Sequence, residues 1–397
     1  MLGLFNRKRK FTNTSSVTFN SSGGGSGDNF GASVDVSADG LTVIVGAPNA
    51  VSYHGNAVVF TRLNNTWTRE QILTSPGTNV DSFGISVALS SDGNTAIVGA
   101  FQEYAIVFVR SGGVWTAQQT LIDTSGAAGD QFGKAVALSS DGNTAIIGAT
   151  ADDVGANANQ GSAVIFTRSG GTWTQQQKIS PFIGAADDYF GYSVALSADG
   201  NTALIGAPFD NIGANTDQGS AFIYTRSGGT WTEQQAISQS GGAANDNFGH
   251  SVALSSDGNT AIVGTYRDDV GANADQGSAT IFTRTSGVWT ATQTLTHASG
   301  AANDWFGQSV ALSDNGNTAI IGERVSDNPG INAGSVIIFN KINSVWVEQN
   351  TIYPLAGNAN LGYSVALSSN GNIAILGAIY GVVSSVMTGF VTIIYRR

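Results

Sequence analysis

The stretch FGYSVALSADGNTALIGAP, residues 190–208, decides how this chain folds, because related copies of it occur seven times along the sequence. Short apolar runs stand on both sides of Asp199-Gly200-Asn201, and this pattern predicts two β-strands joined by a tight turn. The second strand ends in Gly206-Ala207. Each copy therefore predicts one β-hairpin.

Each copy begins with an anchor, a large apolar residue followed by Gly. The anchors are Phe30, Phe83, Phe132, Phe190, Phe248, Phe306 and Leu361, at spacings of 49 to 58 residues. Each unit holds four strand-like pieces, which in the fourth unit are Ser193–Ser197, Thr202–Ala207, Ser220–Arg226 and Thr230–Ile237. Seven such units predict a β-propeller, in which neighbouring four-stranded blades cover each other's apolar faces.

The seventh unit supplies only three strands, so its fourth is expected upstream of the first anchor. Ile237 and Phe19 each precede the next anchor by 11 residues. We therefore predict an all-β fold, a seven-bladed β-propeller of four-stranded antiparallel blades, closed by residues 12–20 as the outer strand of blade 7. Closure removes an open sheet edge. Residues 1–11 then form a basic N-terminal tail, and residues 12–397 form a single domain.

Charge and composition exclude some functions. The chain has 397 residues, no Cys and a net charge of −11, although residues 7–10 are all basic. The acidic body disfavours nucleic acid as a partner, because phosphates would be repelled. No secretory signal is visible. We expect the basic tail either to be flexible or to dock on an assembly partner.

Aromatic residues recur in the outer half of each unit. The predicted fourth strand carries Trp in six units, and the third ends in an aromatic-x-basic pattern, which in the seventh unit reads Tyr395 and Arg397. We expect the aromatic residues to fill space between blades and the basic residue to lie over a Trp or to pair with a turn Asp.

The stretch Ile373–Tyr395 has 23 residues without a charge. Hydropathy alone would make it a membrane anchor. The repeat register predicts instead two buried strands joined by residues 381–385, and hence no membrane insertion.

The pairing of Phe-Gly with Gly-Ala-Pro resembles the FG-GAP repeat of the integrin α-subunit propeller, and more closely the variant in large bacterial and viral surface proteins. The resemblance covers about residues 12–397. It implies a propeller used for adhesion, ligand binding or scaffolding. Integrin-type blades often bind Ca²⁺ in the first turn through several carboxylates, but here each turn has at most one, as at Asp199. We therefore expect no cofactor and no metal, with Ca²⁺ as the alternative.

Acidic residues concentrate in the loops that lead into each anchor and in those between the second and third strands. The candidate binding residues on this loop face are Asp152, Asp153, Asp188, Asp210, Asp246, Asp268, Asp269, Asp304 and Trp305. The simpler interpretation is that each Asp caps its own loop. The alternative is an acidic ring that binds a cation or a basic partner. Trp305 is either an exposed contact residue or packed within its loop. The longer loops of blades 3–5 are the expected recognition sector.

No catalytic constellation is apparent, so we expect a protein that is not an enzyme. His54, His250 and His297 stand at different repeat positions with no matching Cys or carboxylate. His250 follows an anchor Gly, at a position that varies between units in a way that suggests tolerated substitution.

The sequence thus predicts a non-catalytic scaffold that binds a protein or glycan, with an extracellular or virion surface as the favoured location. The alternatives are a structural filler without a ligand, and a hydrolase or lyase that uses loop-face acids.

Overall fold

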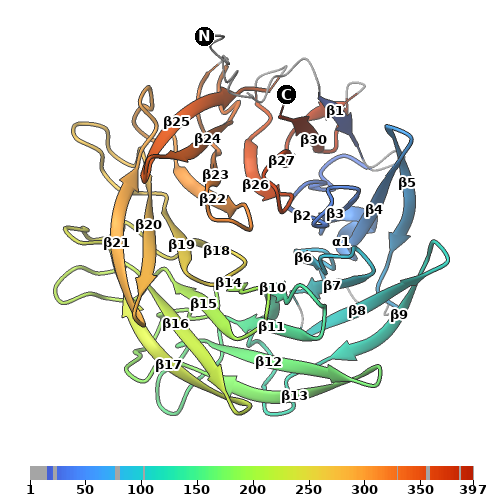
Figure 1. The fold of residues 1–397 in the computed structure, drawn as a ribbon, viewed down its shortest axis with the longest axis horizontal. Helices are drawn as coiled ribbons and strands as arrows, with labels where there is room; N and C mark the ends of the chain where they lie inside the picture. The colour runs from blue at the N-terminus through green and yellow to red at the C-terminus, as the bar shows by residue number, and fades with distance from the viewer. Residues whose placement is uncertain are drawn as a thin grey trace, which may run out of the picture.

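The computed structural model describes residues 16–20, 25–76, 81–101, 103–328, 330–354, 358–383 and 386–396. The expected basic tail, residues 1–11, and residues 12–15 lie outside this part. Seven four-stranded antiparallel sheets stand in a ring around a central axis (Figure 1). The predicted seven-bladed propeller is confirmed.

Six blades use four consecutive strands each, ordered from the axis outward as in the chain. Blades 1 and 2 are formed by β2 (Ser33–Val36), β3 (Thr42–Ala47), β4 (Asn56–Leu63), β5 (Thr66–Leu73), β6 (Ser86–Leu89), β7 (Thr95–Ala100), β8 (Tyr104–Ser111) and β9 (Val114–Leu121). The short helix α1 (Ala50–Tyr53) lies between β3 and β4. Blades 3 and 4 are β10 (Phe132–Leu138), β11 (Thr144–Ala149), β12 (Ser162–Ser169), β13 (Thr172–Ile179), β14 (Ser193–Leu196), β15 (Thr202–Ala207), β16 (Ser220–Ser227) and β17 (Thr230–Ile237).

Blades 5 and 6 are β18 (Ser251–Leu254), β19 (Thr260–Thr265), β20 (Ser278–Thr285), β21 (Val288–Leu295), β22 (Phe306–Leu312), β23 (Thr318–Glu323), β24 (Ser335–Ile342) and β25 (Val345–Ile352). Blade 7 combines β26 (Leu361–Leu367), β27 (Ile373–Ala378) and β30 (Phe390–Tyr395) with β1 (Val17–Phe19). A small hairpin of β28 (Val382–Val383) and β29 (Val386–Met387) precedes β30.

The N-terminal strand closes the ring in the predicted register. β1 pairs antiparallel with β30, with Phe19 opposite Val391. In blade 4 the outer strand places Ile237 opposite Ala221. Val391 and Ala221 themselves pair with the Gly of the Gly-Ala sequence in their second strands. Phe19 therefore has the position of Ile237, and β1 and β30 lie side by side (Figure 1).

One detail of blade 7 corrects the sequence alignment. The aromatic-x-basic pattern predicts Arg397 at the position that Arg226 has in blade 4. The structure has Arg396 there, since its backbone N–H donates to Asn372 O at 2.8 Å, as that of Arg226 donates to Asn201 O at 2.9 Å. The aromatic match misled the alignment because an isoleucine fills the buried aromatic position of this strand.

The uncharged stretch 373–395 forms strands. β27 and β30 pair directly, which confirms the predicted two buried strands, and the small hairpin occupies the predicted connection. No helix among the described residues is long and apolar enough to span a membrane.

The repeated Phe-Gly and Gly-Ala residues join neighbouring blades. The anchor Phe190 is 0% exposed. A Cβ at Gly206 would lie 1.9 Å from the Gly249 oxygen of the next blade, and Ser193 Oγ donates to that same oxygen at 2.8 Å. Only Gly allows so close an approach of two backbones.

The outer-strand tryptophans pack against the preceding blade, as expected. Trp231 is 2% exposed. Gln177 Nε2 donates to Trp231 O, and the Trp231 backbone N–H donates to Gln177 Oε1, both at 2.9 Å. The guanidinium carbon of Arg226 lies 5.4 Å from the Trp231 ring centre. The closed disc positions two sets of connecting loops, and those that carry the candidate residues lie together on one face.

Candidate functional site

Three loops between second and third strands, residues 152–161, 210–219 and 268–277, share one conformation. In each loop the N–H of the last Gly donates to the backbone oxygen of the first Asp at 2.9 Å. The Asn157 side chain donates to Gln160 Oε1 at 2.7 Å and to Gly184 O at 2.9 Å, so it ties its loop to the one that leads into the next anchor. The expected recognition sector is thus three internally bonded, repeated loops. Ligand binding by them stays a prediction.

Asp188, Asp246 and Asp304, two residues before their anchors, are buried. Each carboxylate accepts the backbone N–H of the Ala three residues earlier, at 2.5 to 2.6 Å. Burial raises the pKa of each carboxyl group to about 6, while this hydrogen bond lowers it and nearby acids raise it further. Each of these Asp residues therefore caps its own loop, as the simpler interpretation of the sequence expected.

The three Asp residues that open the long loops have different partners. In the order Asp152, Asp210 and Asp268, the donors to their carboxylates are Lys178 Nζ at 2.6 Å, Ser220 Oγ, and Gln239 Nε2 at 2.7 Å. Lys178 and Ser220 belong to the outer and third strands of the same blade as their Asp, whereas Gln239 follows the outer strand of the preceding blade.

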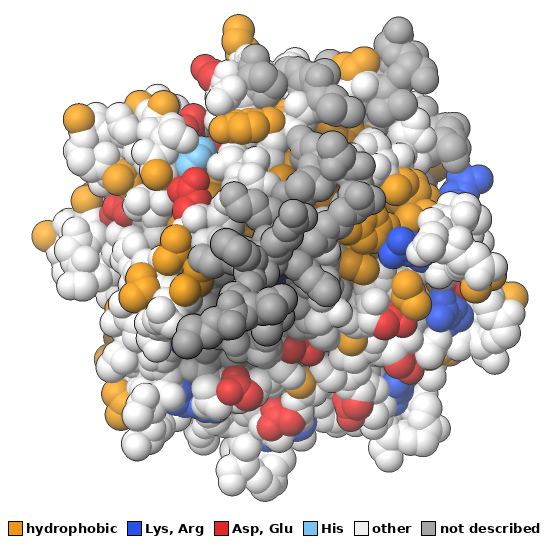
Figure 2. Space-filling model, turned by 45° about the horizontal axis from the view of Figure 1, so that its top comes forward, with side chains coloured by type: hydrophobic (Ala, Val, Ile, Leu, Met, Phe, Trp, Pro, Cys, Tyr) orange, Lys and Arg blue, Asp and Glu red, His pale blue; other side chains and the backbone are white. Residues whose placement is uncertain are grey.

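Asp153 and Asp269 are the exposed members of the candidate set. Each accepts a backbone N–H of its own loop at 2.9 Å. Figure 2 shows acidic side chains spread over the visible face with uncharged ones between them, rather than one continuous acidic patch. The structure therefore does not bring the nine candidate residues into one site.

Trp305 lies in a cluster near the axis, partly buried within its loop. Its ring packs edge-on against Tyr266, with centres 5.6 Å apart, and the guanidinium carbon of Arg324 lies 5.7 Å from its centre. Its backbone is in the left-handed region, with φ of +60°. Trp305 Nε1 is buried and has no hydrogen-bond partner among the described residues.

The residues that follow the anchor glycines form a ring around the loop-face end of the axis. Lys134 Nζ is 5.4 Å from the ring centre of Tyr192, the rings of Tyr192 and His250 are 5.0 Å apart, and His250 Nδ1 is 3.2 Å from Gln308 O. We call this region the axial mouth; it comprises Lys134, Tyr192, His250, Tyr266, Arg267, Trp305, Arg324 and Tyr363.

The electrostatics confirm that these side chains converge. Burial lowers the pKa of His250 to about 4; a backbone hydrogen bond opposes this, and Lys134, Arg324 and Arg267 lower it further. Burial raises the pKa of Tyr192 to about 12; Tyr266 of blade 5 and Tyr363 of blade 7 raise it further, and Arg324 of blade 6 lowers it. Side chains from five blades, 3 to 7, therefore act on one another at the axis.

Along the axis lies a cavity of about 300 Å³, lined by Val, Ala and Leu of the inner strands. Asp35 lines it where the other six blades have Ala. The Asp35 carboxylate accepts the backbone N–H groups of Val36 at 2.8 Å and Leu89 at 2.7 Å. Burial raises its pKa to about 6, although both hydrogen bonds lower it.

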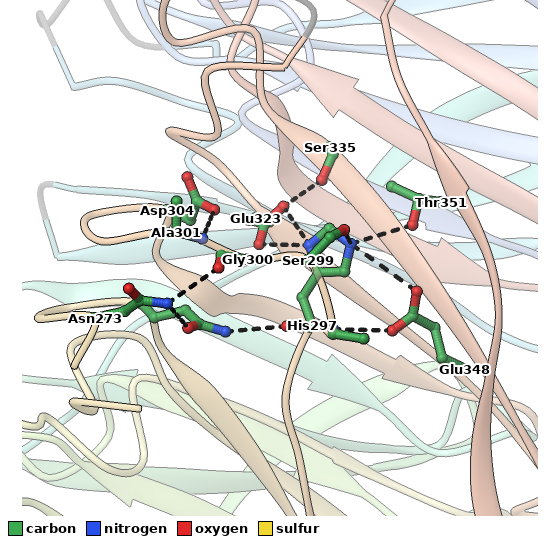
Figure 3. A network of polar contacts seen from close by, with 12 residues as sticks. Asn273, His297, Ser299, Gly300, Ala301, Asp304, Glu323, Ser335, Glu348 and Thr351 are labelled. Atoms are coloured by element: carbon green, nitrogen blue, oxygen red, sulfur yellow. Dashed lines mark hydrogen bonds and ion pairs between the residues drawn. The ribbon is translucent and has the colours of Figure 1, made fainter. Parts of the chain in front are cut away.

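A second polar cluster lies between blades 5 and 6 (Figure 3). His297 Nδ1 is 2.9 Å from Glu323 Oε1, and Ser335 Oγ donates to Glu323 Oε2 at 2.6 Å. On the other side of the ring, His297 Nε2 is 3.0 Å from Ser299 Oγ and 3.9 Å from Glu348 Oε1. Burial opposes protonation of His297, but Glu323 and the nearby acids outweigh it and raise the pKa of His297.

The first-turn Asp residues are used within their turns. Asp199 accepts from Ser197 Oγ at 2.6 Å and from the backbone N–H of Asn201 at 3.0 Å. Asn315 accepts from Ser313 Oγ in the same way at 2.8 Å. No group of three or more potential metal ligands occurs among the described residues.

Comparison with known protein families identifies the repeat that forms the blades. The family described as FG-GAP repeat matches residues 115–166, 173–224, 231–282 and 289–339, together slightly more than half of the chain. The chain belongs to the FG-GAP repeat family. A search of curated proteins found no match.

Each matched FG-GAP repeat begins at an outer-strand Trp and ends at the third-strand aromatic residue of the next blade. The family's unit therefore spans a blade interface, where the anchor Phe and the Gly-Ala pair make their contacts. The family explains the scaffold, while the axial mouth and the His297 cluster are built from positions at which this chain's own repeats differ.

Sequence reasoning missed Asp35, Glu323 and every residue of the axial mouth except Trp305. A position-by-position comparison of the FG-GAP repeats could have found the first two, because Asp35 replaces Ala in the inner strand and Glu323 replaces the Ala of Gly-Ala. Lys134, Tyr192, His250 and Tyr363 stand at a variable position that suggested tolerated substitution, and only the ring geometry shows that they meet Tyr266, Arg267, Trp305 and Arg324.

Proposed function

We propose that this FG-GAP propeller is a non-catalytic binding scaffold, which engages a partner protein or glycan through its loop face at a cell, particle or virion surface. The observation that carries this proposal is the set of three long loops, 152–161, 210–219 and 268–277, each held by its own hydrogen bonds on a closed disc. A preformed surface loses little conformational freedom on binding, so more of the contact energy contributes to affinity.

The test compares the two faces of the disc. Ala156, Ala214 and Ala272 are exposed in the three loops, and their joint replacement by Arg blocks that surface. The matched control replaces Thr172, Thr230 and Val288 by Arg; these are exposed at turns of the opposite face and receive the same added charge.

Binding of the labelled full chain to intact cells and to an array of immobilised glycans is then measured. We expect the loop-face variant to bind about tenfold more weakly or worse, and the control to bind as the wild type does. Equal binding by both variants would contradict the proposal. Absence of binding to any surface would favour a structural filler.

A second candidate function is hydrolysis, which one arrangement favours. Ser299, His297 and Glu323 stand in the order of nucleophile, base and orienting carboxylate, with contacts of 3.0 and 2.9 Å. The raised pKa of His297 counts against it, because an imidazolium cannot accept the serine proton. We therefore rank hydrolysis below binding.

Hydrolysis has its own test. The protein is incubated at pH 9 with a fluorophosphonate probe, which labels activated serines, and Ser299→Ala serves as the control. We expect no difference between the two proteins. Labelling of the wild type alone would establish a reactive Ser299 and replace the non-catalytic proposal.

A further inference from the structure

The axial mouth gathers positive charge at the centre of an acidic protein. Lys134, Arg267 and Arg324 converge there, although the chain has a net charge of −11 and only 17 Lys and Arg in all. None of the three takes part in an ion pair among the described residues, where other cations such as Arg110 and Lys178 do. Like charges held together without a counter-charge destabilise the free protein and favour an anion.

Hydrogen-bond donors at the mouth also lack acceptors. Arg267 Nε, Arg324 Nε and Trp305 Nε1 are buried atoms without a partner among the described residues. A buried donor that is left unsatisfied destabilises the free protein. Nε and one terminal nitrogen of an arginine together match the two oxygens of a carboxylate. The donors therefore indicate a planar anion at this point.

Aromatic rings surround the cations. Arg324 lies 4.8 Å from the ring centre of Tyr363, and Arg267 lies 5.3 Å from that of Tyr266. The rings of His250 and Tyr266 are 4.4 Å apart. Aromatic faces attract weakly positive C–H groups, and the edges of a tyrosine or tryptophan supply polar contacts. Such walls suit a small ring that has both C–H faces and hydroxyl groups.

Asp275 acts on the Tyr266 side chain, but among the described residues no ion pair joins an acid to Lys134, Arg267 or Arg324. Asp35 is three residues beyond the ring position of its own strand, which is about 10 Å at the rise of a β-strand. The exposed Asp153 and Asp269 lie in the surrounding loops, and they disfavour a polyanion that would extend across the face. A compact ligand with one negative charge fits both conditions.

We propose that the axial mouth binds a carboxylate-bearing sugar, with Arg267 and Arg324 holding the carboxylate and the rings of Tyr192, Tyr266 and Trp305 packing against the sugar. This rests on the proposed binding function and assigns the ligand class to a site at the centre of the loop face. The cavity of about 300 Å³ below the mouth has the size of a small ligand pocket.

The test is calorimetric titration of the full chain with galacturonic acid and, as the uncharged match, galactose. We expect the acid to bind and galactose to bind about tenfold more weakly or worse, because galactose lacks the charged acceptor. Arg267→Gln and Arg324→Gln should each weaken binding of the acid by about tenfold. The control is Arg284→Gln, since Arg284 stacks on Trp289 at an outer-strand turn, away from the mouth.

Lys134→Gln provides a third mouth variant should an arginine variant fail to fold. Equal affinity for both sugars, or unchanged binding in all folded mouth variants, would overturn the inference, as would binding of an acidic peptide but not of the sugar acid. If the acid does not bind while the loop-face variant still loses cell binding, this inference fails and the proposed function stands. If the acid binds but the loop-face variant binds cells as the wild type does, the sugar-acid site stands and the proposed loop-face function fails.

Discussion

Two blade interfaces differ in the charge at one equivalent position. The interface between blades 2 and 3 has an acidic residue there, and the interface between blades 5 and 6 has a basic one. Asp123 and His297 each stand two residues after the outer strand of the leading blade. Asp123 accepts from Lys178 of the next blade at 2.9 Å. His297 instead faces Glu323, at 2.9 Å. The same position thus carries the acid in one interface and the base in the other.

The difference shows that this position can hold an acid or a base, and that its partner comes from a different strand of the next blade, β13 for Lys178 and β23 for Glu323. Between blades 4 and 5 the equivalent Gln239 donates to Asp268 at 2.7 Å, so that pair carries only one charge. Lys178 keeps its charge through the physiological range, because its two carboxylate partners raise its pKa above the ordinary value despite burial. His297 loses its charge as the pH rises through its raised pKa. Only the blade 5–6 interface should therefore respond to mild alkali.

The largest expected effect comes from separating the His297 pair. Glu323→Thr introduces the residue that blade 5 has at this position, Thr265, and leaves a buried His297 without its carboxylate. We expect a loss of about 3 kcal/mol in unfolding free energy, because one partner of a buried pair remains. Urea denaturation measures it.

The double variant His297→Gln/Glu323→Thr is the control; it introduces the residues that the blade 4–5 interface has at these two positions, Gln239 and Thr265. It should recover most of the lost stability, because no buried charge remains unpaired. If the double variant is as unstable as Glu323→Thr, the unpaired His297 is not the cause of the lost stability.

A smaller effect is expected at the blade 2–3 interface. Lys178→Met leaves the Asp123 and Asp152 carboxylates without their shared cation. The lysine side chain is 25% exposed, so water replaces part of the interaction, and we expect a loss of about 1–2 kcal/mol at pH 7. An unchanged urea midpoint would show that this interface does not depend on the ion pair.

The smallest effect is a difference in pH dependence. The pKa of His297 is raised above its ordinary value of 6.5, so the stability from its charged form is fully present below pH 6.5 and is lost as pH rises through the folded-state pKa. The stability gap between wild type and the double variant should therefore shrink as the pH is raised from 6 to 9.

The gap between wild type and Lys178→Met should stay constant over this range. Hydrogen bonds from Ser125 and Lys178, together with the lysine charge, lower the pKa of Asp123 despite burial, so its contribution is lost only as pH falls below 3.8. Parallel curves for the two interfaces would contradict the comparison.

The sequence predicted the scaffold because its contacts recur in six or all seven units. Phe190 and Gly206 have counterparts in the other units, and the 11-residue offset of Phe19 located the closing strand. The capping role of Asp188 could be anticipated because its partner is only three residues away.

The polar sites could not be predicted in the same way. His297 meets Glu323 across two blades, and neither residue recurs in its repeat position. Lys134 and Arg324 come together only because the ring bends blades 3 and 6 around one axis. A repeat pattern identifies only the residues that recur in every unit. The polar sites of this chain are formed by residues that differ from the repeat.

The antiparallel pairing of β1 with β30 has a mechanical consequence. Val17 lies opposite Ile393, so the chain before β1 and the chain after β30 leave the sheet at the same end. Tension applied through both ends would therefore break the three residue pairs between β1 and β30 one after another, and would not shear them all together. Tethered by both ends, the disc should open at blade 7 under low force, while the other six blades remain folded.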